Sequence, residues 1–298
     1  MGRLALRPGL RAYAHAPAGV DDLWTPESIP GLILWIDPSE HAAGTVTSIA
    51  DKSAQGISDS VVFTADSDII AGAITDDGGQ GNGLNFLQST SVNSPRELHY
   101  VPTGSPYNTD TVGGYTEDWL IWNVVTLGAP SANIVDGYGG LSRGRGGSLN
   151  RAAWAVKWYH DDTDAYSPKI QTGSNSNLTG TSASISWASS YSGYTGAAPP
   201  AFNSSTFVIF FRSFDDAGTR KIEISFDGST WAQYTHADTS TIISGTYNYW
   251  EISTSYDSSD SWSWAGIGEC GFVDGAGATQ ANAVLLHTYL TEKWDLDL

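Results

Sequence analysis

The sequence predicts an all-β protein, a two-sheet antiparallel sandwich with one C-terminal helix. Three observations predict this class. The 298 residues include 33 Gly, 12 Trp and 14 Tyr but only 15% charged residues, a composition that favours strands and turns over helices. Short apolar or alternating runs recur along the chain and are separated by turns rich in Gly, Asp and Ser. A strong helical pattern of apolar residues occurs only over 279–294.

Continuous apolar runs predict strands that are buried on both faces. These runs are LILWI at 32–36, WLIWNVVTL at 119–127 and TFVIFF at 206–211. A strand with one face in water alternates between apolar and polar residues, so an unbroken apolar run indicates a place inside the fold. We therefore expect 119–127, the most apolar stretch of the chain, to be a central strand.

Other segments predict strands by alternation or by the turns around them. The run KIEISF at 221–226 alternates, follows a tight turn at 215–218, and leads through the hairpin signal Asp227-Gly228 into a return strand at 231–235. Further strands are expected at 45–49, 84–87, 153–158 and 267–273. Irregular segments are expected as a turn at 76–83, a loop at 102–118, a Gly-rich connection at 137–147 and a long surface excursion, with room for a small hairpin, at 171–205.

The helix is expected over 279–294. Thr279 is a favourable N-cap residue, because its hydroxyl can accept a hydrogen bond from a free backbone N–H of the first turn. One apolar face is defined by residues that recur with helical spacing: Ala283, Leu286, Leu290 and Trp294.

The charges divide the chain into an arm, residues 1–28, and a single sandwich domain, residues 29–298. The first twenty residues carry Arg3, Arg7 and Arg11 and no acid, a charge of +3, while the remainder carries 11 basic and 32 acidic side chains, a charge of −21. A basic arm on an acidic body can dock on its own body, on a neighbouring copy or on another acidic protein. We interpret it as an assembly arm, with a frayed terminus as the alternative.

Composition excludes several classes of function. The net charge of −18 would repel phosphates, so no nucleic-acid partner is expected. No apolar run approaches the roughly 20 residues that span a bilayer, so no membrane insertion is expected. The single cysteine, Cys270, excludes an intrachain disulfide framework and a cysteine-rich zinc site, and its apolar strand predicts a buried, inert thiol.

The acidic and histidine residues do not form a recognisable catalytic or metal-binding motif. Glu223 and Asp227 are the nearest match to a glycosidase pair, but four strand residues separate them by about 13 Å, whereas glycoside hydrolysis needs roughly 5–9.5 Å. The acidic loop at 161–164 lacks the Gly and Glu of an EF-hand, and the six scattered His form no zinc motif. We therefore expect no enzyme activity, no metal site and no cofactor.

Aromatic residues in the last sixth of the chain form the candidate site for binding a glycan or a partner. The rings lie among Ser and Asp, and exposed rings in such surroundings stack on sugars or fill a protein interface. The alternative is that they fill the core between the sheets, since Trp is usually buried. The candidate residues are Trp250, Tyr256, Trp262 and Trp264.

Separated segments of the chain resemble the concanavalin A-like, laminin-G-like jelly-roll domains of bacteriophage virion proteins. Ile49 stands where this family usually has Trp, and residues 171–205 have no counterpart. The segments that carry the resemblance are GLILWIDPSEHAAGTVTSIADKS from Gly31, NGLNFL at 82–87, KIEISFDG at 221–228, and a closing strand and helix at 266–294 that ends in YLTEKW.

The resemblance implies a jelly-roll sandwich and a role as a virion structural protein, either a tail-fibre-like or a capsid-decoration component. Its partners would be other virion proteins (capsid, portal or tail) and further copies of the chain, in three-fold symmetry if fibre-like. It would be located in the virion after assembly in the host cytoplasm, and binding of a surface glycan can accompany this role. Because the fold also hosts lectins and hydrolases, the alternatives are a stand-alone carbohydrate-binding lectin-like module and a polysaccharide depolymerase.

Overall fold

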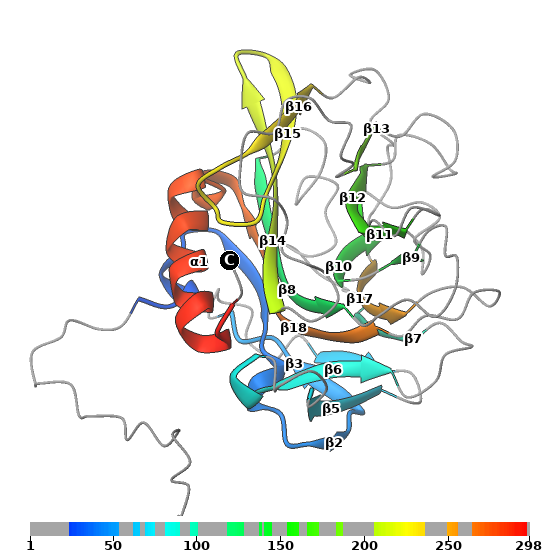
Figure 1. The fold of residues 1–298 in the computed structure, drawn as a ribbon. Helices are drawn as coiled ribbons and strands as arrows, with labels where there is room; N and C mark the ends of the chain where they lie inside the picture. The colour runs from blue at the N-terminus through cyan, green and yellow to red at the C-terminus, as the bar shows by residue number, and fades with distance from the viewer. Residues whose placement is uncertain are drawn as a thin grey trace, which may run out of the picture.

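Two antiparallel β-sheets pack face to face, and one helix covers the outer side of one sheet (Figure 1). This architecture confirms the all-β sandwich with a C-terminal helix. The expected arm lies mostly outside the described residues. The structure, a computed structural model, describes residues 24–53, 62–65, 69–74, 81–89, 96–100, 118–127, 137–138, 140–144, 154–160, 166–172, 183–186, 206–235, 249–255 and 264–296.

Sheet A lies between the helix and the second sheet. Its described strands, in spatial order, are β16 (Ala232–Thr235), β15 (Thr219–Ser225), β14 (Thr206–Asp216), β8 (Trp119–Leu127), β18 (Trp264–Asp274), β6 (Asn85–Ser89), β5 (Ile69–Ala73) and β2 (Gly44–Thr45), and β1 (Leu32–Ile36) pairs with β18.

Sheet B forms the other layer of the sandwich. Its described strands, in spatial order, are β13 (Ala183–Ser186), β12 (Tyr166–Thr172), β11 (Trp154–His160), β10 (Gly140–Gly144), β17 (Tyr249–Ser255), β7 (Arg96–Tyr100), β4 (Val62–Ala65) and β3 (Ser48–Ala50), and β9 (Gly137–Tyr138) pairs with β11. The described helical segments are α1 (Gln280–Trp294) and the short 3₁₀ turns η1 (Pro26–Ser28), η2 (Pro38–Glu40), η4 (Gly81–Gly83) and η6 (Gly275–Gly277).

Sheet A is buried on both faces, which explains its continuous apolar strands. In β8, Trp119 and Ile121 belong to the core between the two sheets. The residues on the opposite face of β8 belong to a second core, between sheet A and α1, and are Leu120, Trp122 and Val124. β14 alternates between the two cores in the same way. An unbroken apolar run is therefore required here, because neither face of these strands meets water.

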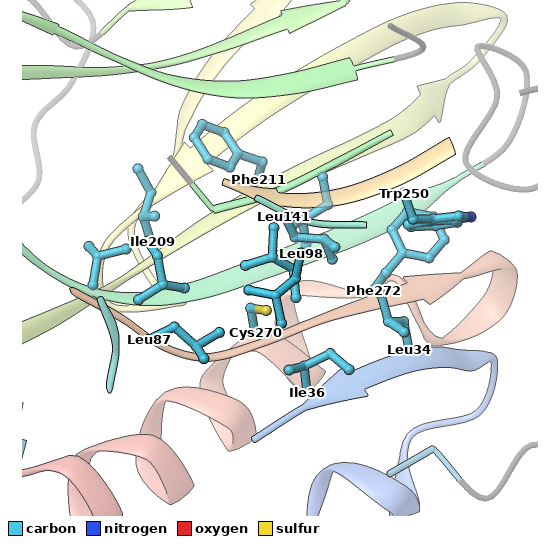
Figure 2. Close-up of a cluster of buried hydrophobic side chains, with 14 of the residues drawn as sticks. Leu34, Ile36, Leu87, Leu98, Leu141, Ile209, Phe211, Trp250, Cys270 and Phe272 are labelled. Atoms are coloured by element: carbon cyan, nitrogen blue, oxygen red, sulfur yellow. The ribbon is translucent and has the colours of Figure 1, made fainter. Parts of the chain in front are cut away.

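Trp250 and Cys270 both lie in the core between the sheets (Figure 2). The ring of Trp250 is fully buried and meets Phe272 edge to face, with ring centroids 5.3 Å apart. Cys270 is a free, buried thiol, as the sequence predicts. Burial and the nearby carboxylates raise its pKa far above the ordinary value, so the neutral thiol persists at physiological pH.

Asn123 joins the two sheets through a polar contact inside this apolar core. Its side-chain Oδ1 accepts a hydrogen bond of 2.8 Å from the backbone N–H of Leu141 in β10. Gly140 has a φ of +104°, and a Cβ at this position would lie 2.6 Å from the Asn123 Oδ1. Only a residue without a side chain lets the two strands approach so closely.

The helix and most of the expected strands are confirmed. Thr279 caps α1 by accepting a hydrogen bond from the N–H of Asn282 at 3.1 Å, and the expected apolar face is buried. β1 and β8 match the expected ranges 32–36 and 119–127, and β14 extends beyond the expected 206–211. The hairpin turn at Asp227-Gly228 joins β15 to β16.

Two predictions of local structure are wrong. The expected strand at 45–49 is two strands, β2 in sheet A and β3 in sheet B, because the chain crosses between the sheets near Val46. The Gly-rich stretch at 137–147 is more than a connection, since it contains β9 and β10. Its small residues permit the close approach to Asn123 described above.

Several strands of sheet B were not predicted. β7 (RELHY) and β12 (YSPKIQT) contain few apolar residues, so neither alternation nor an apolar run marks them. β12 and β13 pair as a hairpin at the start of the expected excursion 171–205. Most of this excursion, and all of the loop expected at 102–118 except residue 118, lie outside the described residues.

A glycine in β18 provides a test of the core between sheet A and α1. A Cβ at Gly271 would lie 2.1 Å from the Trp122 ring and 2.6 Å from the carbonyl oxygen of Leu34. We expect Gly271→Ala to lower the free energy of unfolding by about 2–3 kcal/mol, because a packed core cannot absorb the added volume. Gly72→Ala in β5 is the control: its Cβ would meet only the Gln88 amide at 3.4 Å, so the change should stay within about 0.5 kcal/mol. Equal effects of the two substitutions in urea unfolding would contradict this description of the core.

Candidate functional site

Helix α1 is the element on which the distant segments of the chain converge. The ring of Phe86 from β6 packs on Trp294 with centroids 4.8 Å apart. The turn at Gly228 lies so close to α1 that a Cβ there would approach the carbonyl oxygen of Ala283 to 2.6 Å. The amide of Asn82 in η4 donates to the carbonyl oxygen of Lys293 at 3.4 Å. The last turn of α1 also enters a buried group of charges.

This charge cluster consists of Asp37, Glu269 and Lys293. The carboxylates of Asp37, after β1, and Glu269, in β18, are fully buried, while the Lys293 side chain is 22% exposed. The Lys293 Nζ lies 2.6 Å from an oxygen of Asp37 and 2.7 Å from an oxygen of Glu269. A buried carboxylate is tolerated only when a cation and hydrogen-bond donors replace its water, and Lys293 serves both carboxylates.

Two indole rings complete the hydrogen bonding of Glu269. The Nε1 of Trp35 donates to one carboxylate oxygen at 2.7 Å, and the Nε1 of Trp294 donates to the other at 3.3 Å. Tryptophan can be fully buried here because its polar N–H has a partner. Both carboxylate oxygens of Glu269 thus accept hydrogen bonds from protein donors, which gives this residue a structural role.

Lys52 and Asp51 link a further segment to the cluster. The Lys52 Nζ lies 3.1 Å from Asp37 and 4.3 Å from the centroid of the Trp35 ring, and it also pairs with the exposed Glu40. Asp51 accepts a 2.7 Å hydrogen bond from the backbone N–H of Trp35. The DKS motif at 51–53 therefore fixes the segment that carries Trp35, in β1, and Asp37, directly after it.

Burial and pairing shift the pKa values of the cluster in different directions. Burial raises the pKa of Glu269 above its ordinary value, and the proximity of Lys293 only partly offsets this. Burial also acts to raise the pKa of Asp37, but Lys293, Ser39 and Lys52 outweigh it and hold the pKa below its ordinary value. The pKa of Lys293 is raised, because the two carboxylates outweigh the effect of its burial.

A pocket of about 450 Å³ opens beside the charge cluster on the outer side of α1. Its lining includes Trp24, Leu285, Tyr289, Glu292 and Lys293. The rings of Trp24 and Tyr289 meet edge to face, with centroids 6.2 Å apart. We call this the α1 pocket. Its aromatic and aliphatic walls, with a carboxylate beside them, can hold an apolar side chain or a cation that stacks on a ring.

The outer side of α1 exposes apolar side chains next to the α1 pocket. Among the described residues, the large apolar side chains that are exposed are Val284, at 40%, and Leu285, at 43%. Leu285 lines the pocket. This site was not predicted, because the helical spacing of apolar residues marks only the buried face of α1. The sequence did contain a signal for it: Val284 and Leu285 are large apolar residues that do not belong to the i, i+3, i+7 spacing of the buried face.

The structure places one of the four candidate aromatic residues in the core. Trp250 is fully buried between the sheets, so it presents no ring to a glycan or a partner, and the alternative core interpretation applies to it. Its alternation with Ile252 along β17 directs both side chains inward. Tyr256 and Trp262 lie outside the described residues, and of Trp264 the structure describes only the backbone, at the start of β18. Their binding role stays a prediction.

The acids considered as a glycosidase pair both have structural partners. Glu223 is buried, with an oxygen 2.6 Å from the Arg212 Nη1 and 2.9 Å from the Gln280 amide. Asp227 accepts hydrogen bonds from the backbone N–H groups of Ser229 at 2.8 Å and Thr230 at 2.7 Å. These bonds fix the turn between β15 and β16, and against the opposing effect of burial they lower the pKa of Asp227.

The other sequence-predicted sites remain outside the described part of the chain. Arg3, Arg7 and Arg11 precede residue 24, where the description begins, and the acidic loop 161–164 falls in a gap. Within the described ranges, no group of three His, Cys, Asp or Glu side chains is arranged to hold a metal ion. The described helices do not include one with the length and apolarity needed to cross a membrane.

Solved structures resemble this chain at low similarity. The CBM40 module of Ruminococcus gnavus IT-sialidase is 12% identical, with a TM-score of 0.39 over 67% of this chain and 98% of that one. A Trypanosoma rangeli sialidase is 10% identical, with a TM-score of 0.45 over 88% of this chain and 33% of that one. Tailspike protein 2 of Escherichia coli O157:H7 bacteriophage CAB120 is 9% identical, with a TM-score of 0.41 over 78% and 28%.

At these identities and TM-scores the neighbours carry no argument about function. No protein-family model and no curated protein sequence matches the chain. The class that the fold and the site define is therefore a β-sandwich whose C-terminal helix is anchored by a buried ion cluster.

The charge cluster predicts a large effect of removing its cation. In Lys293→Met, Asp37 and Glu269 lose the cation between them, and we expect the free energy of unfolding at pH 7 to fall by about 3–5 kcal/mol. Lys52→Met is the control. Its side chain is more exposed and it shares Asp37 with Lys293, so its loss should cost less than about 1.5 kcal/mol.

The pH dependence of this loss follows from the pKa shifts. In the native protein the low pKa of Asp37 gives stability that is present above the unfolded pKa, near 3.9, and lost as the pH falls through the lower folded value. The raised pKa of Glu269 acts oppositely, since stability falls as the pH rises from about 4.3 to the folded value. Without Lys293 both carboxyl groups favour the neutral form, so the deficit of Lys293→Met should shrink between pH 7 and pH 4.5. A deficit that grows on acidification would be inconsistent with this cluster.

Proposed function

We propose that the chain is a non-catalytic structural module of a bacteriophage particle, a tail-fibre-like or capsid-decoration component. Its basic N-terminal arm tethers it to other virion proteins. It takes the form of a jelly-roll sandwich of the concanavalin A-like kind, and the copies associate with one another, in three-fold symmetry if the component is fibre-like.

The observation that carries this proposal is the convergence on α1 of all the segments that resemble virion jelly rolls. Asp37 comes from the opening segment, Phe86 from NGLNFL, Gly228 from KIEISFDG, and Glu269 from the closing strand, and each contacts the helix or its last turn. The residues that carry the resemblance are those that assemble the fold. This supports a shared architecture and gives these residues structural roles in place of catalytic ones.

The partners of the acidic residues support a role without bond chemistry. A glycosidase needs two carboxyl groups that face a sugar, one of them able to give up a proton. Glu223 is held by Arg212 and Gln280, and Asp227 by the backbone of its own turn. Glu269 is enclosed by Lys293 and two indoles. Each carboxylate is therefore committed to the protein itself.

The charge distribution supports attachment through the arm. A body with a charge of −21 repels further copies at a distance and resists non-specific clumping, which suits a protein present in many copies on one particle. Residues 1–20 of the arm, at +3, have the opposite sign, and they can approach an acidic neighbour that the body cannot.

Removal of the arm tests the tether. A chain without residues 1–20 should keep its melting temperature within about 2 °C, because the described cores begin after residue 24, but it should not appear in particles purified from infected cells. A second variant replaces Arg3, Arg7 and Arg11 with Gln in a chain of full length, which removes the charge and keeps the arm. If charge provides the tether, this variant should also be lost from particles, and the loss should be mimicked by high salt. Normal incorporation of the truncated chain would contradict the proposal.

The second candidate is a stand-alone carbohydrate-binding module. One observation favours it: α1 covers the outer face of sheet A, whereas no described element covers the outer face of sheet B (Figure 1). A free sheet face can offer an extended binding surface. For this candidate the rings of Trp262 and Trp264 contact the sugar.

Alanine substitutions separate binding from folding in this second candidate. Trp262→Ala or Trp264→Ala should abolish binding on a glycan array and leave the melting temperature unchanged. Trp250→Ala should do the reverse and lower the free energy of unfolding by about 3–5 kcal/mol, because its ring is in the core. A wild-type chain that binds no glycan would reject this candidate. Release of reducing ends from a polysaccharide, lost in Glu223→Gln, would instead establish the depolymerase.

A further inference from the structure

We propose that the α1 pocket binds residues 1–20 of the same chain, so that the free protein holds this part of its arm against its own helix. The inference goes beyond the proposed function, because it concerns the free chain and does not depend on any particle. It rests on the position, the lining and the charge of the α1 pocket and on the sequence of the arm.

The position of the pocket brings the arm to it. Trp24 and Thr25 form part of the lining, so the described chain begins at the pocket and the arm is covalently joined to its wall. The segment between Leu10 and Trp24 spans up to about 45 Å when extended, which is ample for the chain to turn back. A segment tethered this closely is present at an effective concentration of about a millimolar, so a weak fit is enough for occupancy.

The lining matches the chemistry of the arm. The arm contains Leu4, Leu6 and Leu10, which can bury their side chains against Leu285 and the rings of Trp24 and Tyr289. Its arginines alternate with these leucines. An arginine can stack on an aromatic ring while its guanidinium reaches a carboxylate, and the pocket offers both groups.

The charge of the pocket also favours this occupant. Glu292 is the carboxylate of the lining, and the cation there, Lys293, is already held by Asp37 and Glu269. The pocket therefore lies in the field of an acidic body and has an acidic group of its own. Residues 1–20, which carry +3 and no acid, are drawn to it, whereas the like-charged body of a second copy is repelled.

Occupancy by the arm would also account for the apolar residues on the outer side of α1. Leu285 is 43% exposed and lies in the pocket wall, on a helix whose opposite face is already buried against sheet A. Exposed apolar groups rimmed by polar ones commonly mark a binding surface. The arm is the covering segment that the chain itself supplies.

Proteolysis of the full chain tests the closed arm. An arginine-specific protease can cut after Arg3 and Arg11 when the arm is open, and intact-mass measurement follows both cuts. We expect Leu285→Lys, which places a cation in the pocket, to be cut about tenfold faster than the wild type. The matched control is Val284→Lys, an adjacent residue of similar exposure that does not line the pocket, and it should be cut at the wild-type rate.

A second variant protects the test against effects on the helix. Leu6→Asp combined with Leu10→Asp changes the arm alone and should release it as Leu285→Lys does. Equal cutting rates in the wild type and in both pocket and arm variants would overturn the proposal. Protection that increases with protein concentration would also overturn it, because the pocket would then hold the arm of a second copy.

Discussion

The fold depends on the pairing of buried charges by Lys293. Asp37 and Glu269 lie in the apolar interior, where an uncompensated carboxylate costs several kcal/mol. One ammonium group serves both carboxylates, and two indole N–H groups complete the hydrogen bonds of Glu269. The charges can be satisfied only when β1, β18 and the last turn of α1 are all in place. Apolar contacts supply most of the driving force for burial, whereas this cluster joins the last turn of α1 to β18 and to the end of β1.

The same geometry makes sheet A the middle layer of the molecule. Its strands have apolar residues on both faces because one face meets sheet B and the other meets α1. The helix is consequently part of the core. Among the described residues, no helix packs on the outer face of sheet B.

The sequence predicts the parts of this structure that follow from local periodicity. β8 and β14 carry continuous apolar runs, and α1 has a capping Thr279 and a regular apolar face, so each was predicted closely. β7 and β12 could not be predicted, because their short polar sequences become strands through their neighbours. The charge cluster joins residues far apart in sequence, and spacing alone does not show that Asp37 and Lys293 meet. The segments that resemble virion jelly rolls contain Asp37 and Lys293, but the resemblance does not show that the two side chains touch. Trp250 was a binding candidate because the sequence around it is rich in Ser and Asp, but its ring is buried between the sheets, as the alternative interpretation expected.

The sequence separation within the cluster constrains how the protein folds during synthesis. Asp37 and Lys293 are 256 residues apart, so this pair forms only after nearly all of the described chain has left the ribosome, whereas Lys52, 15 residues after Asp37, is available early. Lys293 follows Glu269 by only 24 residues, so these two residues emerge close together in time. Because Lys293 serves both carboxylates, final closure of the sheet A core is expected to be delayed until α1 emerges. Docking of α1 is thus expected to be the last step as the chain folds during its synthesis.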